Sequence, residues 1–167
     1  MTSDTPEDDM PSDISRAEVE SWLAQHGWFP GRNVADQIQE HVAFRMRNAE
    51  EQGFPLTRVE NALRFVNSFG LLTLPYPAAP EIAMVIKPDV GYRGDAEDFA
   101  ELAGNIGQAV FPVGYETSEG GIVLVDDSGR FFYLHATGAY FLGDDAFEAF
   151  AWRLGGRQLR DAEDYFV

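Results

Sequence analysis

The sequence of 167 residues contains no cysteine, so it forms neither a disulfide framework nor a thiolate metal site. Its fold must rest on packing, and the absence favours a reducing compartment. The first nine residues, Met-Thr-Ser-Asp-Thr-Pro-Glu-Asp-Asp, lack the basic start and apolar middle of a secretory signal. The longest apolar run away from proline and glycine, residues 82–86, is far shorter than the about 20 residues of a transmembrane helix. We therefore expect a soluble, cytoplasmic protein.

Basic residues are scarce, at 12 against 28 acidic residues, and the formal net charge is -16. The excess is greatest in residues 81–151, which hold 13 acids and 3 bases, whereas residues 152–167 are balanced. Such a field repels nucleic-acid phosphates and anionic membranes and attracts basic surfaces. We expect no nucleic-acid and no membrane partner. The charge fits a basic protein partner, and it fits equally well a role limited to keeping the protein in solution.

The composition supports one domain. With 45% hydrophobic and 13% aromatic residues, the chain can bury one sizeable core but hardly two. Residues 1–13 combine prolines and acids with almost no apolar content, which predicts a disordered acidic tail. We expect a single domain over residues 14–156, and the sequence leaves the structure of the C-terminal tail, residues 157–167, open.

Three helices are expected before residue 71. Capping boxes, in which Ser or Thr is followed three residues later by Glu, predict helix starts at Ser15 and Thr57. Between them, apolar residues spaced four apart predict a longer helix from Val34 up to Gly53. The third helix is predicted to end at Gly70.

Short apolar segments bounded by proline or turn residues dominate after residue 70 and predict strands. They cover residues 71–74, 82–86, 110–116, 122–125, 130–134 and 139–142. A fourth helix is predicted from Asp95 to Ile106, and a fifth is predicted to be capped by Asp144 and to end at Gly155. The pattern predicts an α+β fold, a mostly antiparallel sheet of about five to six strands with helices packed on one side. The other side would remain open as a binding surface.

No catalytic arrangement is recognisable in the sequence. The histidines, His26, His41 and His135, lack the spacing of a helical zinc pair. The one lysine, Lys87, is not part of a phosphate-binding loop, and there is no Gly-x-Ser-x-Gly motif. Adjacent acids such as Asp126-Asp127 favour turn roles over acid-base catalysis, because their side chains diverge. We expect no enzyme activity, no cofactor and no metal.

Five segments resemble, in order, motifs of the third SUKH family of immunity proteins, which has a Smi/Knr-like fold. The most specific is Gly-Trp-Phe-Pro-Gly-Arg-Asn-Val at residues 27–34. The others are the helix-ending Phe-Gly region of residues 65–72, Phe-Pro-Val-Gly at 111–114, Asp-x-x-Gly-Arg-Phe at 126–131, and Leu-Gly-Asp at 142–144. The resemblance covers about Trp22 to Gly155, and the shared order of the motifs carries most of its weight.

These motifs are expected to be mainly structural. The residues concerned are Gly27, Trp28, Pro30, Gly31, Arg32, Gly70, Pro112, Gly114, Gly129 and Arg130. One departure is Leu71, which stands where the family often has a second glycine, so the geometry of the turn there is left open.

The resemblance implies an immunity protein of a bacterial polymorphic toxin system, which binds and neutralises a cognate toxin, often a nuclease, by stoichiometric occlusion. It implies no catalytic residues. The alternative is an intracellular protein-binding or regulatory scaffold with no toxin partner, and an enzyme with an unrecognised site ranks last. The identity and chemistry of the toxin and the oligomeric state are left open.

We expect the partner surface on the last hairpins of the sheet. If Phe131, Tyr133 and His135 share one strand face, that face is the one expected to be exposed. The residues predicted to bind the partner are Glu116, Glu119, Asp126, Asp127, Tyr133, His135 and Tyr140. The structural alternative is a solvated turn with partly buried aromatic residues.

Overall fold

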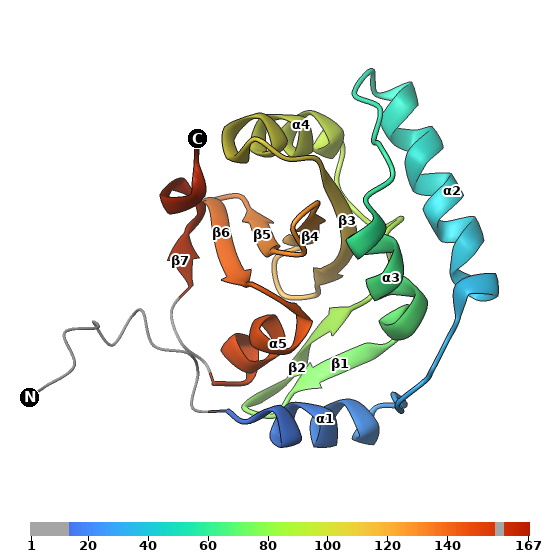
Figure 1. The fold of residues 1–167 in the computed structure, drawn as a ribbon, viewed down its shortest axis with the longest axis vertical. Helices are drawn as coiled ribbons and strands as arrows, with labels where there is room; N and C mark the ends of the chain where they lie inside the picture. The colour runs from blue at the N-terminus through green and yellow to red at the C-terminus, as the bar shows by residue number, and fades with distance from the viewer. Residues whose placement is uncertain (1–13, 156–158) are drawn as a thin grey trace, which may run out of the picture.

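The computed structural model describes residues 14–155 and 159–167 (Figure 1). The expected acidic tail, residues 1–13, lies outside the described residues. The described helices are α1 (Arg16–Gln25), α2 (Ala35–Glu51), α3 (Glu60–Phe69), α4 (Asp95–Ile106), α5 (Ala146–Gly155) and a short 3-10 helix, η2 (Ala162–Tyr165). The described strands are β1 (Thr73–Tyr76), β2 (Ala79–Val85), β3 (Val110–Glu116), β4 (Ile122–Asp126), β5 (Phe131–His135), β6 (Gly138–Gly143) and β7 (Arg160–Asp161).

The seven strands form one antiparallel sheet in the order of the chain, from β1 to β7. This confirms the predicted α+β class. The sheet has one strand more than expected, because β7 pairs with β6 through Tyr140 opposite Asp161 and Phe141 opposite Arg160. Of the C-terminal residues whose structure the sequence left open, Arg160 and Asp161 thus belong to the sheet.

Helices cover both faces of the sheet, which differs from the one-sided arrangement expected. On the first face, α1, α3 and α5 enclose a large core that includes Val123 and Val125 of β4. On the second face, α4 and η2 pack over Ile122 and Leu124 of the same strand. The physical reason is that β4 is apolar on both sides, so each face needs a cover.

The longest helix, α2, lies at the outer edge of the molecule beside α3 (Figure 1). Its inward side buries Ile38, Val42, Arg45 and Ala49. Within the described ranges, no helix is both long enough and apolar enough to cross a membrane.

Helix starts follow the predicted capping pattern at the first helix but not at the third. The Oγ atom of Ser15 accepts a hydrogen bond from the Glu18 amide at 3.1 Å, which caps α1. The capping box predicted at Thr57 does not form, and α3 begins only at Glu60. The reason is that Val59 is extended and fully buried, so tertiary packing holds the chain out of the helix there.

The fifth helix is capped one residue later than predicted. Asp145 precedes α5, and its Oδ1 atom accepts a hydrogen bond from the Glu148 amide at 2.8 Å. The predicted cap, Asp144, is exposed. In contrast, α4 covers the predicted span, and Gly107 ends it in the left-handed conformation with φ of 72°.

The first strand is also displaced from its predicted position. β1 covers residues 73–76 and not 71–74, because Leu71 forms part of the turn after α3. Its φ is 69°, and it is the one non-glycine residue in the described part of the chain with a positive φ. The turn whose geometry the sequence left open therefore places a branched side chain in the left-handed region, where glycine is favoured.

Candidate functional site

Five of the seven residues predicted to bind the partner surround one hollow. We call it the Glu116 depression, and its volume is about 330 Å³. Its lining consists of Glu116, Glu119, Tyr133, His135, Thr137, Tyr140, Arg153 and Leu159. The antiparallel register explains the gathering, because Tyr133 lies opposite Tyr140 and Glu116 ends β3 beside the turn into β4.

A buried ion pair forms the base of the Glu116 depression. The carboxylate of Glu116 accepts hydrogen bonds from Arg153 of α5, from Tyr76 Oη at 2.7 Å and from Ser118 Oγ at 3.0 Å. The guanidinium of Arg153 lies 5.1 Å from the ring centre of Tyr76 and 5.6 Å from that of Tyr133. A carboxylate with three donors, next to a cation held between two rings, is a well-satisfied buried pair.

The two tyrosines of this cluster remain protonated over the ordinary pH range. Burial, together with the Glu116 carboxylate, raises the pKa of both Tyr76 and Tyr133 well above the usual tyrosine value, although Arg153 acts in the opposite direction. Burial alone lowers the pKa of Arg153, but its interactions with Tyr76 and Glu116 outweigh that effect and raise it. The Glu116–Arg153 pair therefore has neutral phenol neighbours.

This geometry corrects the expectation that the tyrosine and histidine face of β5 is exposed. Phe131 and Tyr133 are both buried, at 4% and 7% exposure, because α5 and α3 cover that face. Glu116 is buried at 7% as well. A Cβ atom on Gly121 would lie 2.1 Å from the Tyr133 hydroxyl, so the phenol occupies the space of a side chain there.

The accessible part of the depression is its rim. The Glu119 side chain is 66% exposed and pairs with Nε2 of His135. Nδ1 of His135 accepts from the Thr137 amide at 3.3 Å, and Nε2 of the same ring faces the Glu119 carboxylate. The Thr137 and Tyr140 hydroxyls are 2.7 Å apart. The rim therefore offers a carboxylate, a hydroxyl pair and an aromatic edge.

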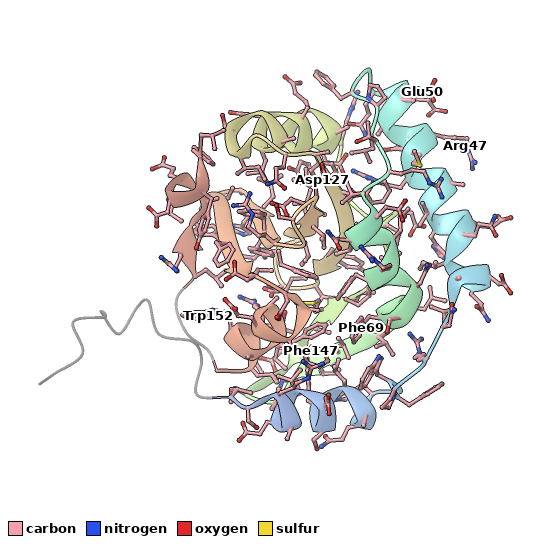
Figure 2. The ribbon with its side chains drawn as sticks, viewed as in Figure 1. Arg47, Glu50, Phe69, Asp127, Phe147 and Trp152 are labelled. Atoms are coloured by element: carbon pink, nitrogen blue, oxygen red, sulfur yellow. The ribbon has the colours of Figure 1, made fainter. Side chains whose placement is uncertain are left out.

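The structure places the other two predicted residues elsewhere, at the opposite end of β4. Asp126 is fully buried, and its carboxylate accepts from the amides of Ser128 and Arg130 at 2.9 Å and from Arg130 Nε at 2.7 Å. It thus holds the β4–β5 turn. Asp127 is exposed beside α3, where its carbonyl accepts from Asn61 Nδ2 at 2.7 Å (Figure 2).

The Gly-Trp-Phe-Pro-Gly-Arg segment closes the end of α3. Arg32 donates to the carbonyls of Ser68 at 2.7 Å and Gly70 at 2.9 Å, which are the free acceptors at a helix C-terminus. The ring of Trp28 stacks on Phe69 at 5.5 Å with an interplanar angle of 8°. A Cβ on Gly70 would lie 2.3 Å from a backbone oxygen, so that position excludes larger residues.

The remaining motif residues lie in turns and close strand contacts. Gly27, Gly31 and Gly129 have positive φ angles of 104°, 84° and 86°. Pro112 and Gly114 flank an irregularity in the β3–β4 pairing, and a Cβ on Gly114 would lie 2.5 Å from a β2 carbonyl oxygen. Pro30 belongs to the turn in which the Arg32 amide donates to the Phe29 carbonyl at 3.0 Å.

Sequence reasoning missed Arg153 and Tyr76, two of the three partners of the Glu116 carboxylate. Tyr76 comes from β1 and Arg153 from α5, so no local spacing connects them with Glu116. One signal was present: Arg153 is the first base after Arg130, in a stretch rich in aromatic residues. An isolated base in an apolar segment requires a buried counter-charge.

The described residues offer no group of three His, Asp or Glu side chains that is suited to holding a metal ion. A second buried pair, Arg45 with Asp95 at 2.7 Å, joins α2 to the start of α4. The Gln52 amide also contacts Asp95, at 3.1 Å. This pair serves to anchor α2.

Comparison with known proteins gives one match. The family model described as SUKH-3 immunity protein matches residues 15–156, from the cap of α1 to the residue after α5. No curated protein and no solved structure matches the chain. Strand β7 and helix η2 lie beyond the matched residues.

Proposed function

Because the chain belongs to the SUKH-3 immunity protein family, we propose that it binds a cognate toxin protein and neutralises it by stoichiometric occlusion. The family match over residues 15–156 is the observation that carries this proposal. The protein forms and breaks no covalent bond in this mechanism, and it acts inside the cell that produces the toxin.

The charge of the chain supports a basic partner. A formal net charge of -16 raises the encounter rate with a cationic protein and lowers it with nucleic acid. Nuclease toxins are one class with such a surface, since they must hold phosphates. The acids therefore act mainly on the association rate, while close contacts in the interface set the dissociation rate.

The rim of the Glu116 depression is suited to making those close contacts. Tyr140 and the 14% exposed side chain of His135 lie at this rim, on strands whose base is held by the buried Glu116–Arg153 pair. A rigid base reduces the entropy lost on binding, because few side chains need to be ordered. Aromatic residues in such positions commonly supply most of the binding energy.

The test is co-expression with the toxin encoded beside this gene, followed by titration of the purified proteins. We expect growth to be rescued, and we expect toxin activity to fall linearly to zero at one equivalent of this protein. Inactivation by far less than one equivalent would indicate catalysis and contradict occlusion. A protein that neither rescues growth nor binds the neighbouring product would instead fit the scaffold alternative.

The rim contacts are tested with the double variant His135→Ala, Tyr140→Ala. Loss of two contact residues at about 1 kcal/mol each weakens binding by roughly 30-fold. The matched control is Arg47→Ala, Glu50→Ala on the distant α2, which is expected to bind like the wild type (Figure 2). Equal affinity of the rim variant and the control would show that the toxin binds elsewhere.

A further inference from the structure

The second face of the sheet carries a larger hollow, which we call the α4 groove. Its volume is about 620 Å³, and it runs between α4 and the turns that join β3 to β4 and β5 to β6. Leu102 of α4, Leu134 of β5 and Ala139 of β6 contribute apolar surface to its lining. The core of this face leaves Leu134 and Ala139 only partly buried.

Three carboxylates line the α4 groove, Asp98, Glu101 and Glu119, and no lysine or arginine does. Glu101 is exposed, and no hydrogen bond or ion pair joins its carboxylate to any residue that the structure describes. Glu119 is 66% exposed. The local charge is therefore negative, and the Glu101 carboxylate is available to a ligand.

Two exposed aromatic residues add to this lining, Tyr92 at 40% and Phe166 at 39% exposure. The Tyr92 hydroxyl donates to Asp98 at 2.6 Å, which fixes the ring and leaves the second Asp98 oxygen available. Burial and this hydrogen bond raise the pKa of Tyr92, so the hydroxyl keeps its proton. Exposed rings beside carboxylates form a surface to which cations bind.

We propose that the α4 groove receives an extended, lysine- or arginine-bearing segment of the partner protein. The aliphatic stem of such a side chain fits the apolar lining while its charged head reaches the carboxylates. The ring of Tyr92 adds a cation–π contact. A volume of about 620 Å³ lies in the roughly 300–1,000 Å³ range of sites that enclose small ligands, so it takes a few side chains and not a whole helix.

This inference rests on the proposed partner-binding function and adds the kind of segment that is recognised. Glu119 and His135 line both the α4 groove and the Glu116 depression, so the contact between their side chains forms the ridge between the two hollows. A partner that crosses this ridge contacts both faces at one edge of the sheet. The second hollow thus extends the binding surface beyond the predicted residues.

The first experiment uses no toxin. Hexalysine and hexaarginine peptides are titrated into the isotope-labelled full-length protein at physiological salt, with hexaglutamate as the negative control. We expect saturable chemical-shift changes centred on the amides of Asn105, Gly121 and Ala139, which line the groove. Shifts spread evenly over all acidic surfaces would overturn the proposal.

The second experiment compares two variants with the same change in net charge. Glu101→Gln, Glu119→Gln removes two groove carboxylates, and Glu50→Gln, Glu51→Gln removes two exposed carboxylates at the end of α2. We expect the groove variant to weaken peptide binding about fivefold and the α2 variant by less than about twofold, since only the first loses direct ion pairs. If both variants weaken peptide binding equally, net charge alone explains the effect, and the proposal that peptides bind in the groove is refuted.

The same variants, tested with the toxin, separate the two proposals. If the toxin is neutralised and the groove variant binds it as tightly as the α2 variant does, the proposed partner contact in the groove is wrong, and the immunity function stands. If the peptides bind in the groove but no toxin is neutralised, the proposed function fails and the cation site remains.

Discussion

The two faces of the sheet differ in how completely they are covered. The first face lies under α1, α3 and α5, and its aromatic residues Trp22, Phe65, Phe69 and Phe150 contact one another at ring distances of 4.9 to 6.0 Å. Among the described residues, α4 and η2 are the helices that cover the second face, and this cover leaves the α4 groove open. One face mainly stabilises the fold, while the other keeps apolar surface available to a partner.

The charges of the two faces differ in the same way. On the first face Glu116 and Arg153 form an ion pair at the base of the Glu116 depression, and Tyr76 donates a further hydrogen bond to the carboxylate. On the second face Glu101 is exposed at the groove. A buried acidic residue paired with a base stabilises the fold, whereas an exposed acidic residue attracts a basic partner. Substitutions should therefore affect stability on the first face and partner binding on the second.

The largest expected effect is on the first face. Arg153→Met leaves the buried Glu116 carboxylate without its cation and should lower the free energy of unfolding by about 3 kcal/mol. The control Arg47→Met, at an exposed α2 position, should change it by less than about 0.5 kcal/mol. Chemical denaturation of both variants measures the difference.

A double variant tests the pairing itself. Adding Glu116→Gln to Arg153→Met should restore part of the stability, because no unpaired charge is then buried. Strictly additive losses would show that the two side chains stabilise the first face independently.

The next effect in size is on the second face. Tyr165 stacks on Phe141 at 4.2 Å and contacts Phe132 at 6.1 Å, so Tyr165→Ala uncovers both rings. We expect a loss of about 2 kcal/mol, less than the roughly 3–5 kcal/mol of a fully buried ring because Tyr165 is partly exposed. Phe44→Ala, which removes a ring 50% exposed on α2, is the control. Equal stabilities in thermal unfolding would mean that the C-terminal segment does not support this face.

Alkaline pH should destabilise the first face. Burial raises the pKa of Tyr76 above its unfolded value of 10.0, so at pH above about 10 the unfolded chain loses this proton first. The contribution of Tyr76 to the free energy of unfolding should therefore be constant below that pH. Above it, this contribution should fall by about 1 kcal/mol per pH unit. Tyr76→Phe should lower the slope by about one proton, as measured by denaturation between pH 9 and 11. An unchanged slope would contradict the pKa shift.

The smallest effect concerns Leu71, where the first face begins. Its φ of 69° makes a comparison of Leu71→Ala with Leu71→Gly informative, because both lose the packing of the leucine side chain beyond Cβ. We expect the glycine variant to be more stable than the alanine variant by about 1 kcal/mol, since only glycine adopts this conformation without steric cost. The reverse order in thermal unfolding would exclude strain at this turn.

Local chemistry made much of the fold predictable. The span of α4, the start of α1 at Ser15 and the span of β3 follow from caps, apolar spacing and turn residues that act within a few positions. The errors occurred where tertiary packing prevailed. Val59 is buried and delays α3, and Leu71 enters a turn required by the α3–β1 connection.

The candidate site was predictable only in part, for a similar reason. Glu119, His135 and Tyr140 lie on neighbouring hairpins, so their proximity follows from strand alternation and the order of the strands. The burial of Glu116 and Asp126 could not be predicted in this way, because a carboxylate is buried only where a basic side chain reaches it. Arg130 is local to Asp126, whereas Arg153 comes from a helix that follows the meander.

By itself, the sequence determined the class of fold, the motif order shared with the SUKH-3 family and the strongly negative charge, since all three depend on residue types and their spacing. Only the tertiary structure decided that both faces of the sheet are covered, that Glu116 is neutralised by Arg153, and that an acid-lined groove lies beside α4. These properties depend on side chains far apart in the chain. How the helices pack on the sheet decides which of these side chains come into contact.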